Sequence, residues 1–165
     1  MSKIRFYTLW IALFLIIIFI LQSFISGFTD LFVLNISAFP ELWRFVTAIF
    51  LHGSIAHLVS NLFALILFGL ILEKLIGSNR FLLVFFVSGI LANIISFSFY
   101  PSSLGASGAI MGIIGTLAII KPMMTIWAFG MIMPMAVAAI VWVLLDILGV
   151  FLPDNVGHIA HISGI

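Results

Sequence analysis

The sequence has no cysteine and very few charged residues. The absence of cysteine from 165 residues excludes disulfide bonds, thiolate metal sites and thiol catalysis. Only 7% of the residues are charged, whereas 65% are hydrophobic, and the formal net charge is +1. So few charges cannot cover the surface of a water-soluble domain of this length, so lipid must solvate most of the chain. A cluster of basic residues is also missing, which argues against a nucleic-acid partner.

Long apolar runs predict a bundle of membrane-spanning helices. A helix needs about 20 apolar residues to cross the hydrocarbon core of a bilayer. We therefore predict an all-α, polytopic membrane protein with one domain over residues 1–165 and six spans. The sixth span is incomplete, because too few residues remain for a full crossing. The predicted spans cover residues 6–28, 55–72, 81–100, 106–121, 124–152 and 156–165.

Three further features refine this topology. The first apolar run is longer than the core of a cleavable signal peptide, so we expect it to be retained as a span. The loop over residues 29–54 is itself fairly apolar and is expected to lie in the membrane interface. Within the fifth span, Pro134 is expected to produce a kink.

The basic residues predict the orientation of the bundle. If the spans alternate in direction, five of the six basic residues fall on one face of the membrane, and only Arg44 falls on the other. These five are Lys3, Arg5, Lys74, Arg80 and Lys121. The positive-inside rule then places the N-terminus in the cytoplasm. The fourth and sixth spans both begin on the outer side, so residues near their starts can share one depth.

A serine between glycines begins the fourth span, in "LGASGAIMGIIG". Serine in a membrane helix usually bonds the carbonyl one turn earlier or packs as a small residue. Ser107 has a distinctive setting, because Gly105 permits a sharp turn and Gly108 removes bulk beside the hydroxyl. Gly108 and Gly112 also leave one helix face bare enough for close approach of another helix. This pattern describes either a nucleophile or an ordinary packing face.

A histidine between glycines lies in the sixth span, in "GHIAHISG". Histidine is costly in lipid, which makes it a candidate functional residue. Gly157, His161 and Gly164 share one helix face, and the glycine face of the fourth span is its natural partner. If the two faces meet, His161 Nε2 can reach Ser107 Oγ, as a general base must. His158 is expected to point elsewhere, although it remains an alternative base.

Neither a third catalytic member nor a metal site is required by this pattern. Asp146 or Asp154 could orient His161, but Asp154 is better explained as a helix cap. We therefore favour a Ser–His dyad without a required carboxylate. The histidine pairs lack the H-E-x-x-H arrangement of zinc proteases, so we predict no metal and no cofactor.

The second span carries another polar pair, in "HGSIAHLVSN". His57 and Asn61 lie four residues apart on one face near the outer end. Both side chains can donate hydrogen bonds, as the stabilisation of a tetrahedral oxyanion requires. The alternative is a polar clamp between helices, worth roughly 0.6–2 kcal/mol. His52, in the preceding loop, is expected to make a structural bond.

Together these motifs resemble the rhomboid family of intramembrane serine proteases. The resemblance rests on Trp43-Arg44 in the first loop, "HGSIAHLVSN" on the second span, "GASG" on the fourth and "GHIAHISG" on the sixth. The last contains the family's G-x-x-x-H-x-x-G pattern. Relatives often carry an aromatic residue one turn after the serine, where this sequence has Met111, whose thioether can still pack against the imidazole.

The resemblance implies a prokaryotic-type, six-helix membrane protease. Ser107 would be the nucleophile and His161 the general base and acid, while His57, Asn61 and the Ser107 N–H would form the oxyanion hole. Glu41, Trp43 and Arg44 would shape a loop lying partly in the outer leaflet.

The expected activity is cleavage of transmembrane segments of membrane-protein substrates near the outer face, in a prokaryotic cell membrane. The expected partners are these substrates and the lipid bilayer, and the oligomeric state stays open. The alternative is a catalytically inactive, rhomboid-like protein that binds membrane clients. A channel or transporter fits less well, because it needs polar residues through the full membrane depth.

Overall fold

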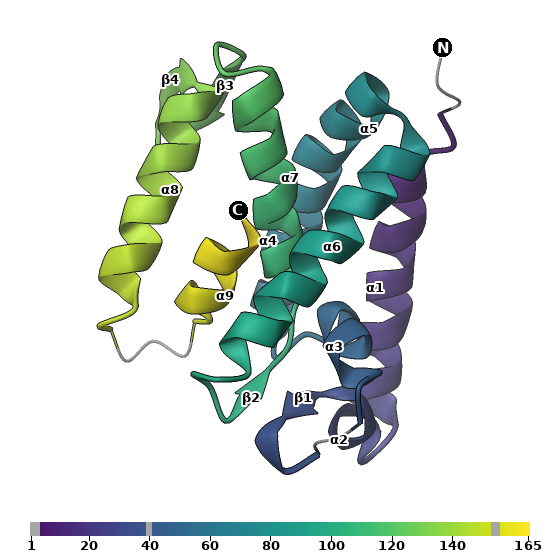
Figure 1. Cartoon of the computed structure of the whole chain (residues 1–165). Coiled ribbons are helices and arrows are strands. Elements are labelled where there is room, and N and C mark those ends of the chain that lie inside the picture. The colour runs from purple at the N-terminus through teal and green to yellow at the C-terminus, as the bar shows by residue number, and fades with distance from the viewer. Residues whose placement is uncertain (1–3, 39–40, 153–155) are drawn as a thin grey trace.

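Long apolar helices make up most of the chain that the structure describes (Figure 1). The structure is a computed structural model and describes residues 4–38, 41–152 and 156–165. Three helical stretches are long and apolar enough to cross a membrane: Tyr7–Phe24, Ile55–Ile76 and Ser78–Ser96. Two shorter apolar helices cover Ser107–Ile120 and Met135–Gly149, and a final helix covers His158–Gly164. The predicted all-α membrane fold is confirmed.

The helices follow the order of the predicted spans. The first, α1 (Tyr7–Phe24), is followed by one continuous stretch formed by α4 (Ile55–Ala64), the π-helical segment η3 (Leu65–Gly69) and α5 (Leu70–Ile76). Next come α6 (Ser78–Ser96), α7 (Ser107–Ile120), α8 (Met135–Gly149) and α9 (His158–Gly164). The predicted spans 55–72, 81–100 and 106–121 each match a helical stretch to within a few residues.

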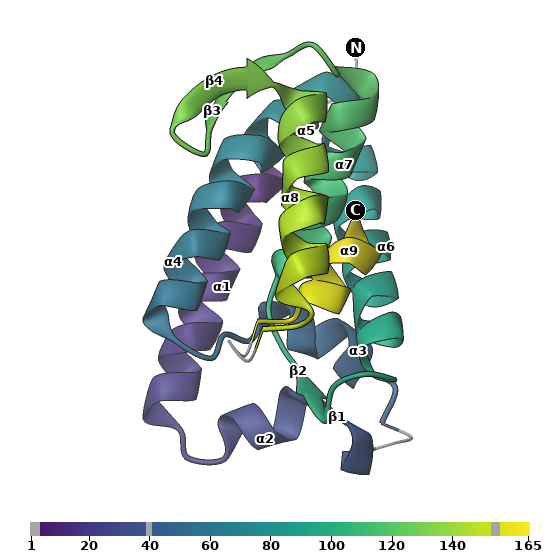
Figure 2. The same ribbon diagram turned by 90° about the vertical axis from the view of Figure 1, so that its left-hand side faces the viewer.

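Helix α7 lies in the middle of the bundle, and its residues from Gly108 to Gly115 are all buried. It packs against α4, α6, α8 and α9 (Figure 2). Its small residues allow this close packing, because a helix with many large side chains could not approach four neighbours. Bulky side chains from the surrounding helices, such as Phe81 and Phe85 of α6, complete the apolar core. The first residue of α7 is therefore held from several sides.

The predicted interfacial loop folds into short elements at the end of the bundle where α7 begins. They are α2 (Phe28–Phe32), β1 (Leu34–Asn35), η1 (Ile36–Ala38), α3 (Arg44–Thr47) and η2 (Ala48–Phe50). Arg44 is 7% exposed and organises this loop. Its guanidinium donates to the carbonyl oxygens of Asp30 and Val33 at 2.7 and 2.8 Å, and it pairs with Glu41. Trp43, in contrast, is exposed on the loop surface.

A carboxylate fixes the opposite end of the bundle. Glu73 of α5 is 1% exposed, and its oxygens accept hydrogen bonds from Tyr7 N and Thr8 N at 2.8 and 2.9 Å. The hydroxyls of Thr8 and Ser78 donate to the same carboxylate. Because the first N–H groups of a helix have no partner within it, Glu73 acts as a cap for α1. This cap joins α1 to α5 and α6.

The fifth predicted span, 124–152, was too long at both ends. Residues 125–134 form an antiparallel hairpin of β3 (Thr125–Ala128) and β4 (Met131–Pro134), and α8 begins only at Met135. Pro134 therefore precedes the helix and does not kink it, since proline suits the start of a helix better than its interior. Phe129 and Gly130 both have positive φ angles, which are required by a tight hairpin turn.

The remaining boundaries differ in smaller ways. The first predicted span, 6–28, ends earlier, because α1 stops at Phe24 and a turn at Gly27 leads into α2. The last predicted span, 156–165, contains α9. The proposed cap Asp154 lies outside the described residues.

Candidate active site

The chain before α7 is tied to the first loop on two sides, which fixes the position of Ser107. The short strand β2 (Ser102–Ser103) pairs with β1, with Leu34 opposite Ser103. Two residues later, Gly105 N donates to Ala48 O at 2.9 Å. Ser107 is then the first residue of α7 and is half-buried. Its hydroxyl stands at the N-terminal end of a 14-residue helix, where the free N–H groups and the helix dipole favour negative charge.

Gly105 allows His57 to lie close to Ser107. Its φ angle is +125°, a conformation that side chains other than glycine rarely adopt. A Cβ atom at this position would lie 2.7 and 2.8 Å from His57 Cε1 and Nε2, and 3.8 Å from Ser107 Oγ. The His57 imidazole of α4 and the Ser107 hydroxyl of α7 therefore border the same small space, which the missing side chain of Gly105 leaves open.

Helices α7 and α9 meet through small residues, as the glycine pattern predicts. A Cβ atom on Gly164 would overlap the carbonyl oxygen of Gly108, and one on Gly112 would lie 2.9 Å from Gly164 O. The face of α9 differs in one respect, because Ala160 takes the place expected for Gly157. A Cβ atom on Gly108 would lie 3.3 Å from Ala160 O, whereas Gly157 meets only Ala160 of its own helix.

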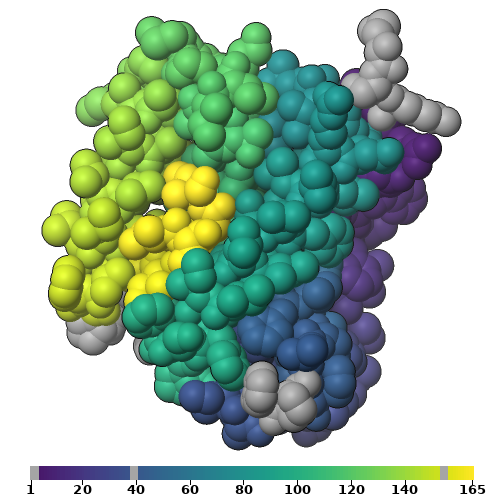
Figure 3. Space-filling model, viewed as in Figure 1, coloured from purple at the N-terminus to yellow at the C-terminus, as the bar shows by residue number. Residues whose placement is uncertain are grey.

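The start of α9 is seated between its neighbours. Tyr100, just after α6, accepts a hydrogen bond on its hydroxyl from Ile159 N at 3.1 Å. In the space-filling view, α9 fills a recess between α6 and α8 (Figure 3). Ala160 faces α7, and His161 lies next to α8, where it contacts Asp146.

One carboxylate joins both histidines of α9. Asp146 Oδ1 lies 3.0 Å from His161 Nδ1 and 2.6 Å from His158 Nδ1. Asp146 is 7% exposed. The expectation that His158 points away from His161 was wrong, because residues three apart on a helix are neighbours on its surface. The sequence contained a signal for this carboxylate, since an acidic residue inside a membrane span is costly and needs a partner.

His57 and Asn61 lie on one face of α4, and the side chain of Asn61 turns back along its own helix. Asn61 Nδ2 donates to the carbonyl oxygen of His57 at 2.8 Å, and Asn61 Oδ1 is buried without a hydrogen-bond partner. Two roles were predicted for the His57–Asn61 pair, a polar clamp between helices and an oxyanion donor. Among the described residues, the Asn61 amide bonds only within its own helix and forms no clamp to another helix. One amide hydrogen of Asn61 is left for an oxyanion, and that role stays a prediction.

His52 supports His57. Their rings meet edge to face, with the centroids 5.0 Å apart. The backbone of His52 is bonded to Gln22, with its N–H 3.0 Å from Gln22 Oε1, whereas its buried ring nitrogens have no partner among the described residues. Burial, together with the neighbouring His57, lowers the pKa of His52 to about 4. The ring is therefore neutral near pH 7 and packs as a structural side chain.

Ser107 and His161 come from two helices in contact, but their side chains are not hydrogen-bonded to each other among the described residues. Such bonds are often long in the absence of substrate and shorten in the reacting complex. His57 lies beside Ser107 at Gly105, and His161 is carried by α9, which packs directly against α7. Met111, one turn after Ser107, is buried in the apolar core.

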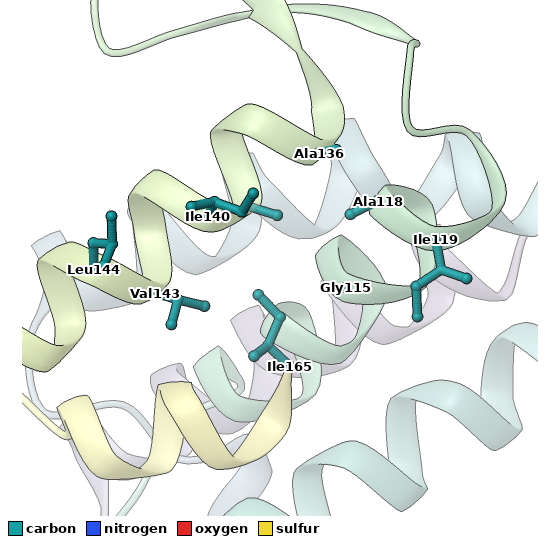
Figure 4. A pocket seen from close by; sticks show the side chains of 9 residues that line it. Gly115, Ala118, Ile119, Ala136, Ile140, Val143, Leu144 and Ile165 are labelled. Carbon is teal, nitrogen blue, oxygen red and sulfur yellow. The ribbon is translucent and has the colours of Figure 1, made fainter.

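Two other features of this region bear on its chemistry. The ligand atoms of Asp146, His158 and His161 lie within 4.8 Å of one another, so these residues could hold a metal ion, although hydrogen bonds already account for their contact. An apolar groove of about 360 Å³ lies between α7 and α8 beside Ile165 (Figure 4). Its lining, which includes Ala118, Ile140 and Leu144, carries no acid, base or nucleophile.

The fold and these residues define a helical integral membrane protein with a serine, histidine and carboxylate constellation at one end. A sequence model of the rhomboid domain matches residues 40–165, and the chain belongs to the rhomboid family. It is 35% identical over 127 residues to RHOMBOID-like protein 6, mitochondrial, of Arabidopsis thaliana, covering 76% of this chain and 41% of that protein. It is 34% identical over 141 residues to the putative rhomboid protease YdcA of Bacillus subtilis, covering 76% of this chain and 63% of YdcA.

A shorter match is more similar. Rhomboid protease GluP of Bacillus subtilis is 51% identical over 79 residues, which cover 47% of this chain and 15% of GluP. The chain therefore spans less than two thirds of the length of each of these three relatives. Family membership supports an intramembrane protease or a rhomboid-like function, and the family resemblance seen in the sequence motifs is confirmed.

Proposed function

We propose that the chain is an intramembrane serine endopeptidase that cleaves transmembrane segments of membrane proteins near the outer face. The observation that carries this proposal is the position of Ser107. Its hydroxyl begins α7 beside His57, and α7 packs directly on α9, which carries His161. A serine at a helix N-terminus beside one imidazole, with a second imidazole on the helix packed against it, supplies the parts that acyl transfer needs.

In the proposed reaction, Ser107 Oγ attacks the carbonyl carbon of the scissile peptide bond while His161 Nε2 takes the hydroxyl proton. The oxyanion is stabilised by His57, Asn61 and the N–H of Ser107. His161 then gives its proton to the leaving amine, and a water molecule releases the acyl-enzyme with His161 as base. The half-buried side chains of Ser107, His57 and His161 support access of water to this site.

The membrane setting adds two parts to the proposal. A transmembrane helix hides its carbonyl groups in backbone hydrogen bonds, so the substrate must unwind locally before it can be cut. The basic residues favour a cytoplasmic N-terminus, which puts Ser107 near the external face. We place the protein in a prokaryotic cell membrane, although its relatives include a mitochondrial plant protein. The reaction needs no cofactor.

Labelling with a fluorophosphonate tests the proposal, because this reagent reacts with activated serines. The wild type should be labelled and should cut a transmembrane substrate, whereas Ser107→Ala and His161→Ala should do neither. Ser98→Ala is the matched control, since Ser98 is an exposed serine near the same end of the bundle, and it should react like the wild type. Equal labelling of Ser107→Ala would contradict the assignment of the nucleophile.

The second candidate is a rhomboid-like protein that binds membrane clients without cutting them. Such a protein would tolerate the arrangement of the described residues, in which Ser107 and His161 are not hydrogen-bonded to each other. It predicts a folded wild type that binds a transmembrane segment but is neither labelled nor active, and that Ser107→Ala binds the segment equally well.

A further inference from the structure

Asp146 is a carboxylate in a place where carboxylates are costly. It lies on the apolar helix α8, three residues before its end, and is 7% exposed. An ionised acid inside a membrane protein needs a partner that compensates for lost hydration. In the described structure that partner is a pair of imidazoles, His158 and His161, both of which reach the same oxygen. Stability alone would be served by an apolar residue here, so the carboxylate calls for a functional explanation.

We propose that Asp146 is a positioning residue for His161, so that the site works as a Ser–His–Asp triad; this inference rests on the proposed function. A carboxylate that accepts a hydrogen bond from Nδ1–H fixes the tautomer of a histidine, because the remaining lone pair then lies on Nε2. That is the nitrogen which must take the proton of Ser107. The same carboxylate stabilises the imidazolium that forms when the proton arrives. It also sets the angle of the ring on the flank of α9.

His158 holds the carboxylate in place from the other side. Its Nδ1 lies 2.6 Å from Asp146 Oδ1, the shorter of the two contacts. The ring is seated directly against the backbone of α8, because a Cβ atom on Gly149 would lie 2.5 Å from His158 Nδ1 and Nε2. Any larger residue at 149 would push this ring away. Gly149 thus makes room for the His158 ring, and His158 acts on His161 only through the Asp146 carboxylate.

The test compares Asp146→Asn with Asp30→Asn, an exposed acid on α2 of the first loop. An asparagine keeps the shape but loses the charge and can favour the wrong tautomer, so kcat should fall on the order of 10²- to 10⁴-fold. The KM for a transmembrane substrate should stay near the wild-type value, the fall in kcat should persist when rates are compared at equal folded fraction, and Asp146→Glu should recover part of kcat. Asp30→Asn should match the wild type in all three.

His158→Ala tests whether His158 holds the Asp146 carboxylate in position. On its own it should lower kcat less than Asp146→Asn does, and the double variant should be no slower than Asp146→Asn, because both changes act through one carboxylate. Multiplied losses in the double variant would overturn the role of His158. An unchanged kcat in Asp146→Asn, or a loss that follows the unfolding midpoint alone, would overturn the role of Asp146.

Treatment with a chelator distinguishes a hydrogen-bonded Asp146 from a metal ion held by Asp146, His158 and His161. Activity should be unchanged by EDTA, since the three side chains are satisfied by hydrogen bonds. Loss of activity in EDTA with recovery in zinc would overturn the inference in favour of a metal centre. A wild type that is neither labelled nor active would overturn the proposed function itself, whereas an active wild type with an equally active Asp146→Asn variant would overturn only the triad.

Discussion

The substitution Gly105→Ala should damage the site far more than it damages the fold. The new Cβ atom would lie 2.7 and 2.8 Å from the ring of His57, about 0.6–0.7 Å short of the 3.4 Å at which ordinary contact begins. The imidazole must move by that amount, away from the space it shares with Ser107 Oγ. A misplacement of about 1 Å can lower a catalytic rate about 10²-fold, so we expect a 10- to 100-fold lower labelling rate and kcat.

Gly27→Ala is the matched control for this substitution. Gly27 has a φ angle of +78°, but a Cβ atom there meets nothing within 4 Å. Both variants therefore carry backbone strain of about 1–3 kcal/mol, whereas only Gly105→Ala displaces a side chain of the site. The assay compares fluorophosphonate labelling rates at equal folded fraction, with unfolding midpoints measured in parallel. If the two variants lose stability equally and retain the same labelling rate, the argument from the His57 contact is refuted.

Three further substitutions test other parts of the structure. Asn61→Ala should lower kcat on the order of 10²–10³-fold if the amide stabilises the oxyanion, and an unchanged rate would leave it only its bond to the His57 carbonyl. Glu73→Gln should lower the free energy of unfolding by about 2–4 kcal/mol, because an amide cannot accept all the bonds that cap α1; equal unfolding midpoints would contradict this. The pKa of His52 falls to about 4 from an ordinary value of 6.5, so its stability contribution is complete above pH 6.5. Between pH 6.5 and 4 the unfolded chain takes up a proton that the folded chain refuses, and stability should fall by up to about 3 kcal/mol. His52→Gln should show a shallower loss over this range in pH-dependent unfolding, and an identical slope would contradict the assignment.

Much of the fold could be predicted because lipid leaves the chain few choices. A run such as residues 55–72 must be helical where no water can bond its backbone, and the structure forms one continuous helix over Ile55–Ile76. The hairpin of residues 125–134 was missed for the same reason. Its sequence "TIWAFGMIMP" is almost as apolar as a span, so hydropathy alone could not separate a strand pair from a helix.

The site was predictable in its elements but not in its contacts. Glycine spacing correctly indicated that α7 and α9 touch, with Gly108 and Gly164 at the contact. The residue that meets α7 lies three positions later than expected, because Ala160 is small enough to serve in place of Gly157. Asp146 was considered as a partner of His161 but not favoured, and the sharing of its carboxylate with His158 was not predicted, since the two histidines lie 12 and 15 residues away on another helix. A periodic pattern within one helix does not reveal the angle between two helices.

A crystal structure of the protein after reaction with a fluorophosphonate would test the central claim most directly. We expect the phosphorus atom to be bonded to Ser107 Oγ, with one phosphonyl oxygen directed at His57 and Asn61. His161 Nε2 should lie within hydrogen-bond distance of the adduct, and its Nδ1 should still contact Asp146. A phosphonate on any other residue, or an adduct on Ser107 with His161 turned away from it, would contradict the proposed chemistry.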